Sequence, residues 1–200
     1  LNYYAVTGLL ARVCLYAGQR ENAFNYSTEV IKASNNGIFP FVDRSLVNGT
    51  AQDPDRIFSP EVLFALSDSQ RGELFEEYFD PSLAPNMVFR METDLLEQTI
   101  YGGTGTGGNL DDYRCRSNWI SSGSARYFYK YSDMTESGRI ENTMIPLLRL
   151  GEMYLIAAES QSNSLANGVS YINTLRKNRG VSNLQTLTTT LLQYEYIREV

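Results

Sequence analysis

Residues 145–159 are IPLLRLGEMYLIAAE, and this stretch decides the fold. It is nearly all apolar, and only Arg149, Gly151 and Glu152 interrupt it. Pro146 suits the first turn of a helix, and a helix that is hydrophobic around most of its circumference is buried on most sides. The stretch therefore predicts a buried helix. Because a buried charge needs a partner, Arg149 and Glu152 are expected to pair with each other or with a neighbouring loop.

Further helices are predicted on the C-terminal side of this stretch. A polar linker at 160–167 precedes an apolar stripe of Val169, Ile172 and Leu175, and Arg179-Gly180 ends that stripe. A last helix is expected to start near residues 188–190, where threonines can cap it. Its apolar positions are Leu192, Tyr196 and Val200.

The N-terminal residues also predict a pair of helices. One helix face is expected to hold Val6, Leu9, Leu10, Val13, Tyr16 and Ala17, and Gly18 ends that run. The next helix has an apolar stripe of Ala23, Tyr26, Val30 and Ala33. Two amphipathic helices joined by a turn of a few residues form an αα-hairpin. Residues 1–37 are therefore predicted to be a first helix hairpin, and residues 144–200 a second one with the start of a further helix.

Residues 38–143 differ in character from both ends of the chain. They hold five of the six prolines and most of the glycines. Residues 61–66 (EVLFAL) and 125–131 (ARYFYKY) favour short strands, and residues 92–99 favour a short helix. The rest is predicted to be long loops, which on a rigid scaffold are usually where function lies. The predicted fold class is therefore mainly α, with an irregular, loop-rich lobe that contains short strands.

The composition of the 200-residue chain excludes several kinds of function. The net charge is −6 and no dense Lys/Arg cluster occurs, which argues against nucleic acid or anionic lipid as the main ligand. No apolar run reaches the roughly 20 residues that span a bilayer. Histidine is absent, which excludes Ser-His-Asp and Cys-His catalysis and zinc sites built from histidine. Cys14 and Cys115 form no metal or redox motif, and no cofactor is predicted.

Two motifs that suggest catalysis are better explained as loops. Residues 103–108 (GTGTGG) match the dinucleotide pattern G-x-G-x-x-G, but neither a strand before them nor a helix after them is predicted. The acidic pairs at 76–77 and 111–112 do not show the two facing carboxylates that a glycosidase needs. Both features are interpreted as surface loops or turns.

The only tryptophan, Trp119, lies in a polar stretch beside Arg116 and Asn118. An exposed indole can stack on the apolar face of a sugar ring, while nearby Arg and Asn side chains bind its hydroxyls. The alternative is a tryptophan that pins a loop to the core, and the sequence leaves both interpretations open. Tyr101 and Tyr113, which flank the glycine-rich loop, are further candidates for contacts with a glycan.

Together these segments resemble the SusD/RagB family. The resemblance covers nearly the whole chain, in the family's order. It rests on residues 9–18 (LLARVCLYAG), 60–64 (PEVLF), 111–114 (DDYR), 130–131 (KY), 145–159 (IPLLRLGEMYLIAAE), 173–180 (NTLRKNRG) and 195–200 (EYIREV). The segment at 173–180 departs from the family pattern because Asn178 is inserted before Arg179.

The resemblance implies tetratricopeptide-like helix hairpins and a function in nutrient capture. Family members are lipid-anchored proteins on the extracellular face of the outer membrane. They catalyse nothing, and they pass oligosaccharides, or in some relatives peptides, to a SusC-like TonB-dependent transporter. The family's lipidated N-terminal portion and its final portion are missing here. The chain is therefore expected to be a single SusD/RagB-like domain that is incomplete at both ends, with any membrane contact made only through an anchor outside it.

Two other functions remain open at this point. A tetratricopeptide-type adaptor would grip a peptide in an open groove of the helices. A carboxylate-based glycoside hydrolase would need two facing acids roughly 5–10 Å apart.

Overall fold

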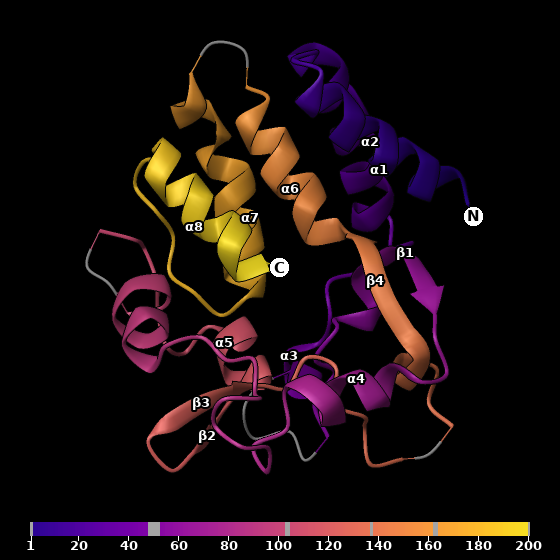
Figure 1. Cartoon of the computed structure of the whole chain (residues 1–200). Coiled ribbons are helices and arrows are strands. Elements are labelled where there is room, and N and C mark those ends of the chain that lie inside the picture. Colours follow the sequence, from indigo (N-terminus) through magenta and orange to yellow (C-terminus); the bar gives the residue numbers. More distant parts are fainter. Residues whose placement is uncertain (1, 48–52, 103–104, 137, 162–163, 200) are drawn as a thin grey trace. The chain divides into compact units, whose positions relative to one another are not determined.

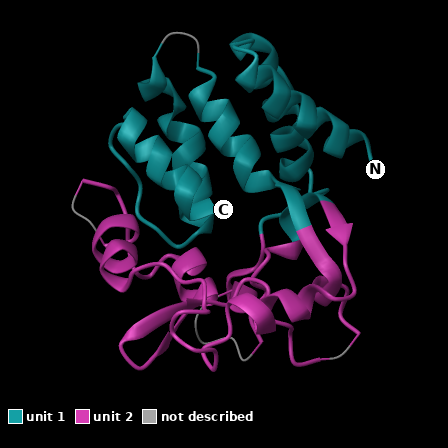
Figure 2. Cartoon of the chain, viewed as in Figure 1, with its two compact units in different colours: residues 1–41, 60–64, 146–200 teal, residues 42–59, 65–145 magenta. Residues whose placement is uncertain are grey.

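The computed structural model describes residues 2–47, 53–102, 105–136, 138–161 and 164–199 (Figure 1). The chain forms two compact units (Figure 2). Unit 1 comprises residues 1–41, 60–64 and 146–200, and unit 2 comprises residues 42–59 and 65–145. The predicted fold class is confirmed, because helix hairpins build unit 1 and short elements joined by loops build unit 2. The organisation as one domain incomplete at both ends stays a prediction.

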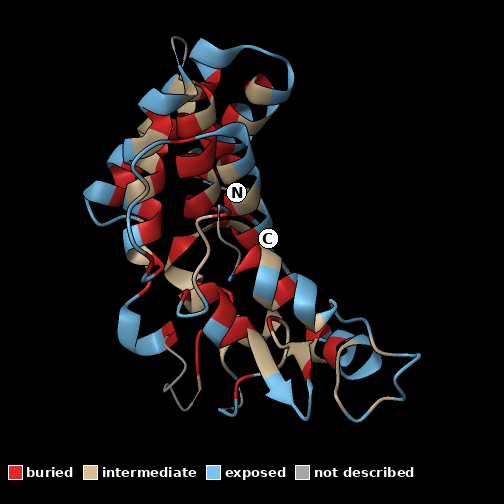
Figure 3. Cartoon of the chain, turned by 90° about the vertical axis from the view of Figure 1, so that its left-hand side faces the viewer, coloured by how far each residue is buried: buried red, intermediate tan, exposed pale blue. Residues whose placement is uncertain are grey.

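Unit 1 is a set of helices packed around α6 (Leu150–Glu159). α6 contacts α1 (Tyr3–Tyr16), α2 (Arg20–Asn35), α7 (Val169–Asn178) and α8 (Thr189–Glu199). The 3-10 turn η4 (Leu165–Gly168) lies between α6 and α7 in the chain. All residues of α6 from Leu150 to Ala158 except Glu152 are buried, as the sequence predicted for this helix. Figure 3 shows in red the positions that are buried along the chain.

The predicted start of the central helix was wrong. Residues Met144–Arg149 form strand β4, which pairs with β1 (Val62–Ser67) in a two-stranded sheet. A proline disfavours helical backbone at the residue before it, here Ile145, and Pro146 is tolerated because each strand of a two-stranded sheet is an edge strand. The helix therefore begins at Leu150, four residues after the proline.

Arg149 and Glu152 each form an ion pair with a residue that is distant in sequence. Glu152 accepts hydrogen bonds from Nε and Nη2 of Arg12 on α1, both at 2.6 Å. Arg149 donates to the carbonyl oxygen of Glu199 on α8 and forms an ion pair with its carboxylate. Since Arg149 ends a strand and Glu152 lies in a helix, the helical spacing on which their mutual pairing was predicted does not apply.

The buried face of α1 differs from the predicted one. Small side chains face the core, namely Ala5, Thr7, Gly8, Ala11 and Cys14. The residues that were predicted to be buried are exposed, namely Ala17 and the larger Val6, Leu9, Leu10, Val13 and Tyr16. The reason is close packing, because a Cβ atom at Gly8 would lie 2.8 Å from Cδ2 of Leu148. On α2 the predicted face is confirmed, with Ala23, Val30 and Ala33 buried.

Gly168 marks another close approach in unit 1. A Cβ atom at this position would lie 2.4 Å from the carbonyl oxygen of Ala158, and backbone cannot move aside as a side chain can. We expect Gly168→Ala to lower the free energy of unfolding by about 1–3 kcal/mol, as overpacking does elsewhere. Urea unfolding followed by circular dichroism measures this, with the exposed Ser170→Ala as control. Equal midpoints for the two variants would contradict the predicted clash.

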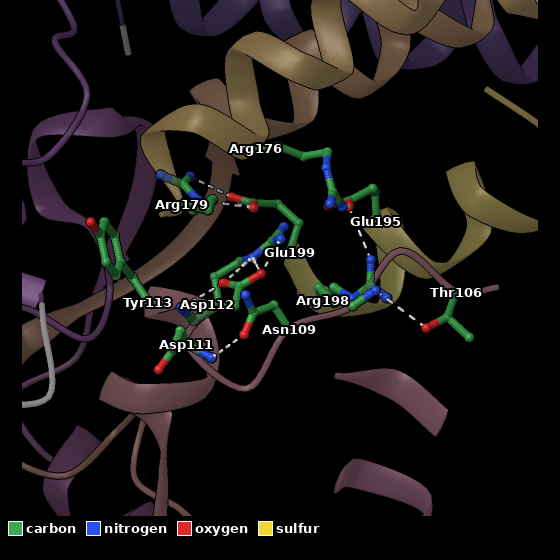
Figure 4. A network of polar contacts seen from close by, with 12 residues as sticks. Thr106, Asn109, Asp111, Asp112, Tyr113, Arg176, Arg179, Glu195, Arg198 and Glu199 are labelled. Carbon is green, nitrogen blue, oxygen red and sulfur yellow. Dashed lines mark hydrogen bonds and ion pairs between the residues drawn. The ribbon is translucent and has the colours of Figure 1, made fainter. Parts of the chain in front are cut away.

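Unit 1 also contains buried arginines paired with carboxylates (Figure 4). Arg179 is fully buried and binds both oxygens of Glu61, at 2.7 and 2.6 Å, and also Oε1 of Glu199 at 2.8 Å. Glu195 accepts from Arg176 and from Arg198. Burial alone would lower the pKa of Arg179, but Glu199 and Glu61 raise it above the ordinary value. These contacts connect η1 (Ser59–Glu61), α7 and α8.

Unit 2 is made of short elements. Its helical segments are α3 (Arg44–Val47), α4 (Arg71–Tyr78), the π-helical turn η2 (Leu95–Ile100), α5 (Tyr113–Asn118) and the 3-10 turn η3 (Ile140–Thr143). β2 (Trp119–Ser122) and β3 (Ala125–Phe128) form an antiparallel hairpin in which Trp119 lies opposite Phe128. Gly123 turns this hairpin with φ of +60°, which glycine adopts without strain.

The predicted short elements of the middle region are largely confirmed. The strands predicted at 61–66 and 125–131 correspond to β1 and β3, and the helix predicted at 92–99 corresponds to η2. α4, α5 and β2 were not predicted from the sequence. Gly103 and Thr104 of the glycine-rich pattern, and Val200 of the last apolar stripe, lie outside the described residues. Among the helices that the structure describes, none has the length and hydrophobicity to cross a membrane.

Candidate functional site

A pocket of about 350 Å³ opens in unit 2 beside the β2–β3 hairpin. α5, both strands of the hairpin and the residues just before α5 supply its lining. The lining residues are Leu110, Asp111, Cys115, Arg116, Trp119, Ile120, Ser121 and Arg126. This volume is at the lower end of the range typical for small-molecule sites. We refer to this feature as the Trp119 pocket.

Local sequence explains how α5 presents its side chains to the Trp119 pocket. Asp112 caps the helix by accepting a hydrogen bond from the backbone N–H of Arg114 at 2.9 Å. The same carboxylate accepts from Nη2 of Arg114 at 2.6 Å, and both side chains are buried. The helix ends when Trp119 adopts an extended backbone with φ of −117°. Arg116 lies in the last turn of α5, and Trp119 is the first residue of β2. Both side chains therefore line the same pocket.

The sequence suggested that Trp119 either stacks on a sugar or pins a loop to the core, and its surroundings match part of each interpretation. The indole is half-buried, and its centroid lies 4.9 Å from that of Phe128 across the hairpin. It also packs against a small core of Leu96, Ile100, Tyr101 and Cys115. The ring thus holds the hairpin to the core of unit 2 and also lines the pocket.

The other predicted binding residues lie elsewhere in unit 2. Tyr101 is only 3 % exposed and belongs to the core that supports Trp119. Asn118 is buried, and its side-chain oxygen accepts from the hydroxyl of Ser117 at 3.2 Å. Tyr113 packs against a separate cluster of Val42, Val47 and Phe58. Of the five candidates, the structure brings Trp119 and Arg116 together in the Trp119 pocket. Contact of the other three with a ligand stays a prediction.

Ser121 and Arg126 line the pocket but were not predicted from the sequence, although the register of the hairpin pairs them. Ser121 lies directly opposite Arg126, one step along the strands from the pair of Ile120 and Tyr127. Arg126 occurs in the alternating stretch ARYFYKY, so a hairpin prediction that included residues 119–122 would have placed it near Ser121. That strand was missed because WISS is short and half polar.

The carboxylates near the Trp119 pocket do not form a hydrolytic pair. Asp111 is the acid among the described lining residues, and its neighbour Asp112 is buried against Arg114. Glu76 and Glu77 lie on the exposed surface of α4. A glycosidase needs two acids that face the bond to be cleaved. The lining of this pocket therefore suits binding rather than hydrolysis.

A second, smaller cavity in unit 2 does contain two acids, Asp55 and Glu141. Burial raises the pKa of Asp55, while the hydrogen bond from Arg139 lowers the pKa of Glu141. Separated pKa values of this kind occur in hydrolases. However, the cavity measures about 10 Å³, which is room for about one water molecule and not for a sugar. These acids therefore do not provide a glycosidase site.

The thiol of Cys115 lines the Trp119 pocket, yet burial raises its pKa to about 12. Only a thiolate reacts rapidly as a nucleophile. We expect iodoacetamide at neutral pH to leave Cys115 unmodified in the folded protein, as peptide mass spectrometry would show. The control is the same reaction in guanidinium chloride, where both cysteines should be alkylated. Rapid labelling of Cys115 without denaturant would contradict the burial described here.

Among the described residues, no group of three or more Cys, Asp and Glu side chains could hold a metal ion. Comparison with known proteins gives no matching family model and no matching curated protein. Solved structures do match, and they show the fold. The likeness extends over both units of the chain.

Three solved structures illustrate this likeness. A SusD superfamily protein from Bacteroides vulgatus matches 99% of this chain and 45% of its own, with 20% identity and a TM-score of 0.64. A SusD-like carbohydrate binding protein from the same species matches 98% of this chain and 41% of its own, with 20% identity and a TM-score of 0.61. A SusD superfamily protein from Bacteroides thetaiotaomicron matches 100% of this chain and 47% of its own, with 20% identity and a TM-score of 0.59. The chain thus has the SusD-like fold and spans less than half the length of these structures.

Proposed function

We propose that this chain is part of a SusD/RagB-family protein that captures oligosaccharides without cleaving them. The observation that supports the proposal most strongly is the SusD-like fold, which extends over the whole chain. One of the proteins with this fold is described as carbohydrate binding. The proposed place for the ligand within unit 2 is the Trp119 pocket.

The chemistry of the Trp119 pocket fits a sugar ring. The half-buried indole offers a flat apolar face, on which the C–H face of a pyranose can stack. Arg116 donates hydrogen bonds, Asp111 accepts them, and the hydroxyl of Ser121 does both. A site of this composition binds by stacking and hydrogen bonding, and it requires neither a cofactor nor a metal ion.

Two observations disfavour the alternative functions. The side chains of α6 are buried among the other helices of unit 1, so the described part of this helix array is filled where a tetratricopeptide-type adaptor would hold a peptide. In the Trp119 pocket, Asp111 has no second acid facing it among the described lining residues, which disfavours a glycoside hydrolase. Capture without catalysis therefore explains the site better.

We also propose a place for the whole protein in nutrient uptake. It would be held by a lipid anchor on the extracellular face of the outer membrane and pass its ligand to a SusC-like TonB-dependent transporter. This step rests on the SusD-like fold and on the sequence motifs that resemble the family. Purification of the full-length protein from membranes, followed by identification of its co-purifying partner, tests it. Recovery without any TonB-dependent transporter would contradict it.

The binding proposal has a direct spectroscopic test. Trp119 is the only tryptophan of the chain, so intrinsic fluorescence excited at the indole band reports on the pocket without background. We expect a saturable change in emission on titration with one member of a panel of soluble α- and β-glucans and other glycans. Chromatography of the incubated glycan should show no shorter products. An unchanged spectrum with every glycan, confirmed by calorimetry, would refute glycan capture at this pocket.

A further inference from the structure

The charged side chains of the Trp119 pocket occur as pairs of opposite sign. Arg126 donates from Nε to Oε1 of Glu97 at 2.6 Å and from Nη1 to the carbonyl oxygen of Trp119 at 3.0 Å. Nη1 of Arg116 lies 3.3 Å from Oδ1 of Asp111. Each of the two arginines in the described lining is thus matched by a carboxylate, Arg116 by Asp111 in the lining itself and Arg126 by Glu97, which lies outside that lining.

We propose that the Trp119 pocket selects neutral sugars and rejects uronic acids and sulfated sugars. The inference rests on the proposed function and names the class of glycan that this pocket takes. Recognition of a carboxylate or sulfate by arginine depends on N–H groups that are free to form a bidentate contact. In Arg126, Glu97 occupies the single N–H of Nε and the Trp119 carbonyl takes one N–H of Nη1, so the side-on fork of Nε and Nη2 is not open to an anion.

The pair of Arg116 and Asp111 disfavours the binding of an anionic sugar for a different reason. The side chains of Arg116 and Asp111 are 48 % and 72 % exposed, and ion pairs of this kind are weak. An acidic sugar could therefore displace Asp111 from Arg116. The displaced carboxylate would remain close to the ligand and repel it, and the net charge of −6 adds to this repulsion.

A neutral sugar meets no such conflict. Each hydroxyl group both donates and accepts, and a guanidinium–carboxylate pair offers both kinds of partner side by side. The remaining N–H groups of Arg116 and the oxygens of Asp111 can bind neighbouring hydroxyls while the pair stays intact. The indole of Trp119 then contributes the apolar face, on which charge has no favourable role.

A matched pair of polysaccharides tests the inference. The probe is the neutral glucan that gives the strongest fluorescence response, compared with the same glucan after oxidation of its C6 hydroxyls to carboxylates. We expect the oxidised form to bind at least about tenfold more weakly. Affinity of the neutral form should change little with added salt, because no net charge is neutralised on binding.

Variants separate the charge effect from folding. Glu97→Gln removes the negative charge beside Arg126, and Asp111→Asn removes the one beside Arg116 without disturbing any buried group. Each should raise the affinity for the oxidised glucan relative to the neutral one, by about threefold to tenfold. Glu76→Gln removes the same charge from the exposed surface of α4 and should leave that ratio unchanged. Circular dichroism confirms that each variant is folded.

The outcomes distinguish the inference from the function on which it rests. Oxidised glucan that binds as tightly as the neutral glucan would overturn selection for neutral sugars and leave glycan capture standing. Selection for neutral sugars is also overturned if neither Glu97→Gln nor Asp111→Asn changes the ratio of the two affinities. Failure of every neutral and oxidised polysaccharide to bind would instead overturn glycan capture at this pocket, and the selectivity with it.

Discussion

Replacement of Arg179 with methionine is expected to lower the free energy of unfolding by at least about 3–5 kcal/mol, the cost of breaking a buried ion pair from one side. Arg179 has no exposed surface, and it holds both oxygens of Glu61 and the carboxylate of Glu199. Methionine fills a similar volume but removes the cation that Glu61 and Glu199 share, and Arg149 is 3.7 Å from the Glu199 carboxylate, too far to replace the contact at 2.8 Å. Because domains are stable by only about 5–15 kcal/mol, this loss is a large fraction of the free energy of unfolding.

Urea unfolding followed by circular dichroism measures the loss in free energy of unfolding. Two further variants show whether this loss comes from the buried ion pairs. Arg20→Met changes an exposed arginine of the same unit and should shift the free energy of unfolding by less than about 0.5 kcal/mol. Adding Glu61→Gln to Arg179→Met removes one of the charges that Arg179 balanced and should recover part of the loss. If Arg179→Met unfolds at the same urea concentration as Arg20→Met, the buried network is not a source of stability.

The helices of unit 1 were predictable where hydrophobic periodicity matched the burial. In α2 and α6 the large apolar residues face the core, so the apolar pattern identified both the helix and its buried side. In α1 it identified the helix but the wrong side. Small residues such as Gly8 and Ala11 allow α1 to pack closely against its neighbours, and this advantage is not visible in a scale of hydrophobicity.

Partners in the ion pairs of unit 1 could not be predicted from sequence spacing. Glu152 and Arg12 are 140 residues apart, and Arg179 and Glu61 are 118 apart. Local rules cover residues three or four positions apart on one helix, and they suggested Arg149 for Glu152. Only tertiary packing brings η1, α7 and α8 close enough for Arg179 to bind two acids at once.

The candidate site was predictable to the extent that its residues are close in sequence. Arg116 and Trp119 are three positions apart, and the composition around the only tryptophan suggested both. The same reasoning also selected Asn118, which the end of α5 turns into the interior. The hairpin register brings Arg126 to the site, and η2 positions its partner Glu97; the sequence specifies neither in detail.

Replacement of Trp119 with alanine is expected to weaken glycan binding by at least about tenfold, because aromatic anchors carry much of the energy of a small site. The ring also packs on Phe128 and on the core around Leu96, so the alanine variant should lose stability as well. Trp119→Phe separates the two effects. A phenyl ring keeps part of the packing and of the stacking face, so its affinity should lie between those of the native protein and the alanine variant.

Calorimetry is the appropriate measurement, since these variants no longer contain the fluorescent residue. Tyr16→Ala is the matched control, because Tyr16 is an aromatic side chain that is 86 % exposed on α1 and does not line the pocket. It should bind glycan within about twofold of the native protein. If a folded Trp119→Ala variant binds as tightly as Tyr16→Ala, the glycan does not bind in the Trp119 pocket. Glycan capture would then have to be located on another surface of the chain, and the charge pairs of Arg116 and Arg126 would serve the stability of unit 2 alone.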